Sequence, residues 1–144
     1  MTTFFEHERS SYRRNYMRNL IILAALDGHV NEKERKLIYR IGKSRGLKNW
    51  QLDELIAEDM RDAEVFVPET SGNRMSLLYD LMLMVYLDGE VDDQETDLIK
   101  RIIAKYNLRQ ELVDHLIDLF RYGAPPAGEW NDFVDHVNRE FVRG

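Results

Sequence analysis

Apolar residues recur at spacings of three and four along most of the chain, and this spacing places them on one side of an α-helix. No segment alternates apolar and polar residues for long, as a half-buried strand would. The pattern therefore predicts an all-α protein of about seven helices. The expected helices cover residues 4–26, 31–46, 50–56, 76–87, 92–106, 112–120 and about 128–142.

One part of this pattern occurs twice, at an offset of about 61 residues. Residues 20–47 and 81–108 align without a gap and share eleven identical positions, which indicates a duplicated helical hairpin. Repeat one is expected at about 16–60 and repeat two at about 74–122. The connector over 61–73 is short, so we expect one domain over 1–144 in which the two repeats pack together.

The doubled residues predict the local structure of each hairpin bend. A glycine ends the first helix in the left-handed conformation, and an Asn or Asp then forms a capping box with a Glu three positions later. These residues are Gly28, Asn31 and Glu34 in the first copy and Gly89, Asp92 and Glu95 in the second. Gly46 and Asn107 are expected to end the following helices in the same left-handed conformation.

Capping does not explain Asp27 and Asp88. Negative charge at a helix C-terminus is unfavourable by up to about 1 kcal/mol, so a positive neighbour is expected. Arg40 and Arg101 are internal candidates, and a bound cation is the other. The alternative is that all the doubled residues serve the fold alone, as caps and apolar staples.

An EF-hand is one form that a cation site at these residues could take. The second half of its loop matches the spacing from Asp27 to Glu34 and from Asp88 to Glu95. Its first ligand position, however, falls on Leu23 or Met84. Calcium needs six to eight oxygen ligands, so a complete EF-hand is not expected.

The doubled D-G-x-V-x-x-x-E pattern extends in the first copy to L-x-x-L-A-x-x-D-G-x-V-x-x-x-E. A Gly-Leu or Asn-Leu helix end follows about 12 residues after the Glu. Over about residues 16–120 the chain thereby resembles the TerB-like superfamily, which includes the tellurite-resistance protein TerB. The resemblance implies an all-helical, pseudo-twofold domain with an acidic face and a role in stress or tellurite resistance. It also implies a divalent-metal site at Asp27, Glu34, Asp88 and Glu95.

Charge differs sharply between the two copies. Residues 88–108 hold six acidic and three basic residues, a net charge of −3, whereas residues 27–47 hold three acidic and six basic residues, a net charge of +3. Hard cations of the Ca²⁺ or Mg²⁺ class prefer carboxylate oxygens, so the second copy is the better candidate, with Glu90 and Asp92 as supporting ligands. The alternative is a metal-independent adaptor that docks a protein partner, or a second copy of itself, through its charged faces.

Composition limits the kinds of partner and the kinds of chemistry that we expect for this chain. The chain has no cysteine, its net charge of −6 argues against nucleic acid, and its longest apolar runs are far shorter than the roughly 20 residues of a membrane helix. No signal-peptide pattern is present at the start, so a cytoplasmic location is expected. No catalytic motif appears, so we do not expect an enzyme.

Two weaker features carry alternatives. The N-terminal segment could contact a membrane surface or an acidic protein, or could simply be a docked helix; its residues are Phe4, Phe5, Arg9, Tyr12, Arg13, Arg14, Tyr16 and Arg18. Asp132, His136 and Glu140 stand four apart and could hold a metal, although ion pairs on the helix surface are the more common use of such spacing.

Overall fold

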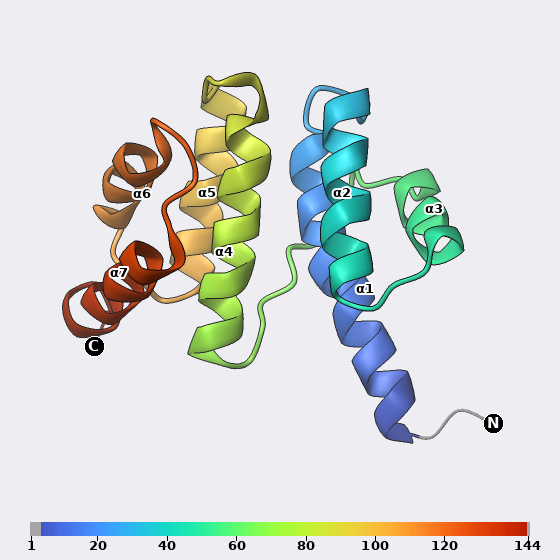
Figure 1. Ribbon diagram of the computed structural model, residues 1–144, viewed down its shortest axis with the longest axis horizontal. Helices are drawn as coiled ribbons and strands as arrows, with labels where there is room; N and C mark the ends of the chain where they lie inside the picture. Colours follow the sequence, from blue (N-terminus) through green and yellow to red (C-terminus); the bar gives the residue numbers. More distant parts are fainter. Residues whose placement is uncertain (1–3, 144) are drawn as a thin grey trace. The chain divides into compact units, whose positions relative to one another are not determined.

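The computed structural model describes the backbone of residues 4–143 and the side chains of residues 11–143. Within that range the chain is all-α, with seven α-helices and one short 3-10 helix, η1, as the hydrophobic pattern predicts (Figure 1). The chain divides into two compact units, one ending at Pro68 and the other beginning at Glu69, and each is described by itself. That the two repeats pack as one domain stays a prediction.

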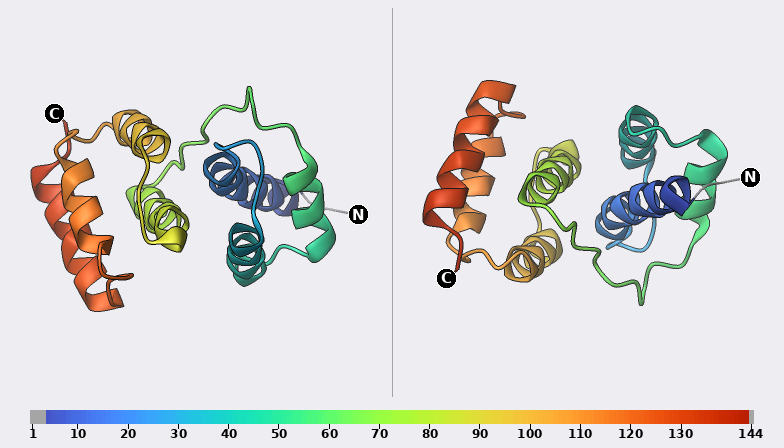
Figure 2. Two further views of the ribbon diagram at one scale, coloured as in Figure 1. Left: turned by 90° about the horizontal axis from the view of Figure 1, so that it is seen from above. Right: turned by 90° about the horizontal axis from the view of Figure 1, so that it is seen from below.

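The first unit contains α1 (Phe4–Ala24), α2 (Glu32–Ser44) and α3 (Asn49–Ala57). α3 packs against both α1 and α2 (Figure 2). The core is built from the apolar stripes that the sequence shows, including Leu20 and Ile21 of α1, Ile38 of α2 and Leu52 of α3. Gly42 lets α2 and α3 approach closely, because a Cβ there would lie 2.5 Å from a δ-carbon of Leu52.

The second unit contains α4 (Ser71–Val85), η1 (Tyr86–Asp88), α5 (Asp93–Lys105), α6 (Leu112–Phe120) and α7 (Ala127–Glu140). α4 is apolar on most sides and buries seven residues: Met75, Leu77, Leu78, Leu81, Met82, Met84 and Val85. α6 packs against both α4 and α5. An aromatic cluster joins α4, α6 and α7, with the rings of Tyr79 and Trp130 5.0 Å apart.

α4 begins earlier than the sequence pattern predicts. We expect turn chemistry at Ser71-Gly72-Asn73, but these residues form the first turn of the helix. The reason is the N-cap at Thr70, whose side-chain oxygen accepts a hydrogen bond from the Asn73 N–H at 3.1 Å. The expectation of a non-helical segment up to Asn73 is therefore wrong by three residues.

The first bend has the same local geometry in both hairpins. Gly28 and Gly89 have φ of 106° and 80°, which confirms the predicted positive-φ conformation. The Gly28 N–H donates to the Ala25 carbonyl at 2.9 Å, and the Gly89 N–H donates to the Tyr86 carbonyl at 3.0 Å.

Both helix ends that follow are also as predicted. Gly46 and Asn107 have φ of 93° and 58°. The Leu47 N–H reaches back to the Gly42 carbonyl at 3.0 Å, and the Leu108 N–H reaches the Ile103 carbonyl at 3.1 Å. This six-to-one hydrogen bond defines a Schellman motif, which requires the left-handed residue before Leu47 and Leu108.

The C-terminal tail of the second unit is tied to the connector between α5 and α6. Leu108 and Val142 form an antiparallel bridge. The Arg109 N–H donates to the Phe141 carbonyl at 2.8 Å, and the Arg143 N–H donates to the Asn107 carbonyl at 3.0 Å. These bonds fix the end of α7 beside the end of α5.

Candidate functional site

The predicted ligands of the first copy lie in the bend between α1 and α2. Asp27 is exposed, and its Oδ1 is 3.4 Å from the His29 N–H, which donates to it. This local bond gives the carboxylate a backbone partner, as in an Asx-turn. Glu34 is half-buried, and its Oε1 accepts from the Asn31 N–H at 2.9 Å. Arg40 is exposed, and its side chain makes no ion pair within the described residues.

The predicted ligands of the second copy are placed in the same way. Asp88 ends η1 and is exposed, and Glu90 is exposed in the loop that follows. Glu95 Oε1 accepts from the Asp92 N–H at 3.2 Å, while Asp92 Oδ1 accepts from the Glu95 N–H at 2.8 Å. Both predicted capping boxes are thus confirmed. Each box uses one oxygen of its Glu for the fold.

The described residues do not form a ready-made metal site. Among them, no group of three or more His, Asp or Glu residues lies close enough together to hold a metal ion. This holds for the acidic loops and for Asp132, His136 and Glu140 on α7. The ring of His136 instead lies edge-on to Phe141, with centroids 5.4 Å apart. The divalent-cation site stays a prediction, and calcium titration tests it.

The outer face of α2 carries a stripe of cations, which we call the α2 basic stripe: Lys33, Lys36, Arg40 and Lys43. All four are exposed, and none of their side chains forms an ion pair or hydrogen bond with another described residue. Lys33 and Lys43 lie ten positions apart, which is about 15 Å along the helix. Only Glu32, at the start of the helix, adds negative charge to this face.

The corresponding region of the second unit has the opposite charge, and we call it the acidic segment: Asp88, Glu90, Asp93 and Asp97. These side chains are exposed and make no ion pair within the described part of the chain. The structure therefore leaves the four cations of the α2 basic stripe and the four carboxylates of the acidic segment exposed to solvent and to partners.

The N-terminal basic and aromatic side chains are used within the first unit over residues 12–18. Tyr16 is fully buried. An Nη atom of Arg13 lies 3.1 Å from where a Cβ on Gly46 would be, and the Arg14 guanidinium lies 6.0 Å from the centroid of the Trp50 ring. Over this stretch α1 packs against the rest of the first unit. The side chains of Phe4, Phe5 and Arg9 lie outside the described residues.

Arg18 forms a two-pronged ion pair with Glu58, just after α3. Its Nε and Nη2 donate to the two carboxylate oxygens at 2.9 and 3.0 Å. The hydrogen bond from Arg18 lowers the pKa of Glu58, and the same bond raises the pKa of Arg18. The cation therefore holds the end of α3 to α1.

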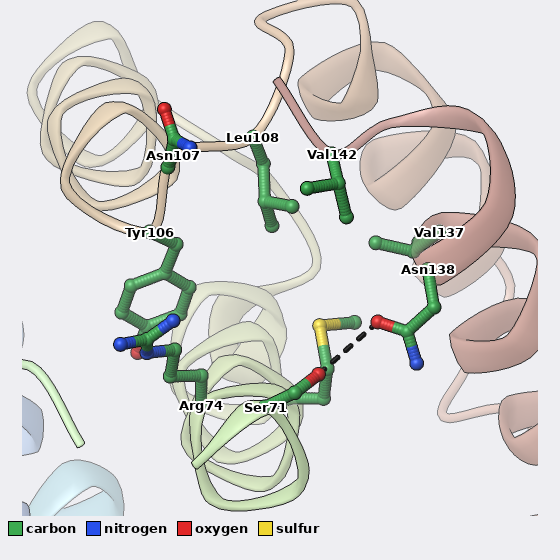
Figure 3. A pocket seen from close by; sticks show the side chains of 9 residues that line it. Ser71, Arg74, Tyr106, Asn107, Leu108, Val137, Asn138 and Val142 are labelled. Carbon is green, nitrogen blue, oxygen red and sulfur yellow. Dashed lines mark hydrogen bonds between the residues drawn. The ribbon is translucent and has the colours of Figure 1, made fainter. Parts of the chain in front are cut away.

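A cavity of the second unit lies between the start of α4, the end of α5 and the end of α7, and we call it the α4–α7 pocket. It has a volume of about 240 Å³. Its lining combines an apolar floor with a polar rim (Figure 3): Ser71, Arg74, Met75, Tyr106, Asn107, Leu108, Val137, Asn138 and Val142. Figure 3 shows the guanidinium of Arg74 beside the ring of Tyr106.

A more open groove, which shares Met75 with the α4–α7 pocket, lies along α4 and α7. Its volume is about 520 Å³, and Tyr79, Trp130 and Val134 contribute to its lining. Neither cavity brings together a nucleophile and a base, or two carboxylates, so neither has the arrangement that acid–base or covalent catalysis requires.

Sequence reasoning missed two features of the structure. Asn19 is a buried polar residue, 2% exposed, in the apolar stripe of α1. Its position among Tyr16, Leu20 and Leu23 in the sequence indicates that it faces the core. The α4–α7 pocket had no such signal, because its walls come from three segments that are far apart in the chain.

No protein-family model matches the chain, and comparisons with curated proteins and with solved structures find no match either. Among the described residues, no helix combines the length and the apolar character needed to cross a membrane.

Proposed function

We propose that the chain is a non-enzymatic, TerB-like binding module that docks a protein partner through its charged helix faces without a metal ion. The observation that carries this proposal is the α2 basic stripe, whose four cations have no partner among the described residues. The doubled motif and the all-helical structure support the TerB-like part of the proposal.

Charge of this kind acts mainly on the rate and the specificity of association. Exposed charges attract an oppositely charged surface over about 8 Å at physiological salt, and like charges suppress wrong partners. The α2 basic stripe is suited to an acidic surface and the acidic segment to a basic one. Because the two lie on different hairpins, one molecule can present both.

The test is affinity capture with wild-type protein and with the double variant Lys36→Glu/Arg40→Glu. Both changes lie on exposed helix positions, so the fold should be retained, which circular dichroism checks. At physiological salt, wild-type protein should capture a specific protein partner, and the variant should not capture it.

A matched control is available on α5. Arg101→Glu/Lys105→Glu reverses the same two residue types at the same spacing, on side chains that are also exposed. It should retain the partner. If both variants lose it equally, only net charge matters and the α2 basic stripe is not a docking face.

Metal dependence separates the proposal from the divalent-cation prediction. Capture should be unchanged by a chelator. If the chelator abolishes capture, and Asp88→Ala with Glu95→Ala does the same, then the acidic loop carboxylates bind a cation of the Ca²⁺ or Mg²⁺ class and the metal-independent proposal is wrong.

A further inference from the structure

We propose that the partner of the α2 basic stripe is a second copy of the chain, which presents the N-terminal half of its α5 and the loop before that helix. This inference rests on the proposed function, because it names the protein that the stripe docks. Two observations carry it. The exposed charges of α2 and α5 are complementary, and they have the same spacing on helices of equal length.

α2 and α5 are equivalent helices of the two hairpins. Each has 13 residues and begins with a capping box. Each buries one apolar stripe within its own unit and exposes charged residues on the opposite side. The exposed side of α2 in one copy can therefore lie along the exposed side of α5 in another copy, over a length of about 20 Å.

Oppositely charged pairs have the same spacing on these exposed sides. Lys36 and Arg40 are four positions apart on α2. Asp93 and Asp97 have the same separation on α5. All four side chains are exposed, and none forms an ion pair within the described part of the chain. Residues four apart lie on one face of a helix, about 6 Å apart along its axis, so the two cations can face the two carboxylates.

The neighbouring charges favour an antiparallel arrangement of the two helices. Lys43 follows Arg40 by three positions, and the exposed Glu90 precedes Asp93 by three. An antiparallel contact therefore brings Lys43 and Glu90 to the same end. A parallel contact with the helices in register would place Arg40 against Arg101, and like charges that meet suppress association.

The other end of the antiparallel contact is nearly neutral. Arg101 lies one turn beyond Asp97 and would meet the start of α2, where Glu32 and Lys33 are both exposed. Because these two charges are opposite, reversal of Arg101 should change the contact little. The Arg101→Glu/Lys105→Glu variant should therefore still bind a second copy, as the proposed function expects for this control.

A contact made of these charges should be weak and sensitive to salt. Ion pairs between exposed side chains contribute little individually, and the net charge of −6 adds repulsion between copies. We expect a Kd of about 0.1–1 mM at low salt. At about 1 M salt the Debye length is only about 3 Å, so the copies should separate.

Sedimentation equilibrium of the purified full chain tests the inference. The average mass should rise with protein concentration at low salt and should be that of one chain at about 1 M salt. Lys36→Glu/Arg40→Glu and Asp93→Lys/Asp97→Lys should each weaken self-association at least tenfold. An equimolar mixture of the two variants should restore it, because the reversed α2 of one variant can face the reversed α5 of the other.

Asp132→Lys/Asp135→Lys is the matched control for net charge, because it reverses two exposed carboxylates on α7. It should associate at least as strongly as wild type. A mixture of the two folded variants that stays monomeric would overturn the inference. So would a wild-type chain that stays monomeric at every concentration, which decides the question even if a variant fails to fold.

Failure of this inference differs from failure of the proposed function. If purified wild-type protein is monomeric while Lys36→Glu/Arg40→Glu still loses a captured protein, the second copy is the wrong partner and the docking face stands. If wild-type protein associates equally at low and high salt, the contact is not made by these charges and the inference is wrong.

Discussion

The side chain of Asn19 binds both backbone groups of Phe66. Its Oδ1 accepts from the Phe66 N–H at 2.9 Å, and its Nδ2 donates to the Phe66 carbonyl at 2.6 Å. Asn19 is buried in α1, so these two bonds attach the extended segment after α3 to the core of the first unit. The amide thereby pairs backbone groups that have no strand beside them.

Replacement of Asn19 should therefore be costly. Asn19→Ala leaves a buried N–H and carbonyl without partners and should lower the free energy of unfolding by about 1–3 kcal/mol. Asn49→Ala, at an exposed position at the start of α3, should change it by less than about 0.5 kcal/mol. Urea denaturation measures both. Equal effects of the two variants would show that the hydrogen bonds between Asn19 and Phe66 do not stabilise the unit.

The glycines should respond in opposite directions to alanine. Gly46 has φ of 93° and faces the Arg13 guanidinium, so Gly46→Ala should destabilise by about 1–2 kcal/mol. Gly128 lies in the first turn of α7 with open space around its Cα, so Gly128→Ala should stabilise by up to about 1 kcal/mol. Melting temperatures compare them. A destabilising Gly128→Ala would contradict the helical placement of this residue.

Two variants separate what the hydrogen bonds of the α5 capping box contribute to stability from what its negative charge contributes. Asp92→Ala should cost about 0.5–2 kcal/mol, because Glu95 loses its N-cap partner. Glu95→Gln keeps the side-chain acceptor for the Asp92 N–H and should cost little. Thermal denaturation checks the order of the two variants. A larger loss in Glu95→Gln would mean that the negative charge matters beyond the cap.

Calcium titration of wild-type protein and of Asp88→Ala/Glu95→Gln tests the divalent-cation prediction. The proposed metal-independent function predicts no saturable heat with millimolar Ca²⁺ or Mg²⁺ in calorimetry. Binding that is lost in Asp88→Ala/Glu95→Gln, whose cap is preserved, would instead place a cation on these loop carboxylates.

The ion pair of Arg18 with Glu58 predicts a dependence on pH. The pKa of Glu58 is lowered from 4.5 by the hydrogen bond from Arg18, so the pair stabilises fully above that value and loses its contribution as pH falls below it. The side chains of Arg18 and Glu58 are 33% and 40% exposed, so the effect should be small and reduced by salt. Stability of wild type relative to Glu58→Gln should fall below pH 4.5, and a constant difference would contradict the pairing.

Much of the fold follows from local sequence signals. Gly28, Gly46 and Asn107 stand where the backbone needs positive φ, and the Asn31–Glu34 pair matches the spacing of a capping box, so these features were predictable. α4 began earlier than expected because a single threonine, Thr70, caps a first turn whose residues also suit a loop.

The candidate sites were less predictable. The charge stripe on α2 follows from helical spacing. Whether a cation of α2 forms an ion pair within the unit depends on how α3 packs beside it. Among the described residues of these two helices, Arg35 is the one cation of α2 that forms an ion pair with α3, and its partner is Asp53. The α4–α7 pocket depends on the bridge between Leu108 and Val142, which joins segments more than thirty residues apart and has no local signature.

The most direct measurement is the amount of partner captured by Lys36→Glu/Arg40→Glu relative to Arg101→Glu/Lys105→Glu, in the presence of a chelator. The proposed function predicts that the α2 variant retains far less partner than the α5 variant, which should match wild type. Equal capture by the two variants, or no capture by wild-type protein once metal is removed, would contradict it.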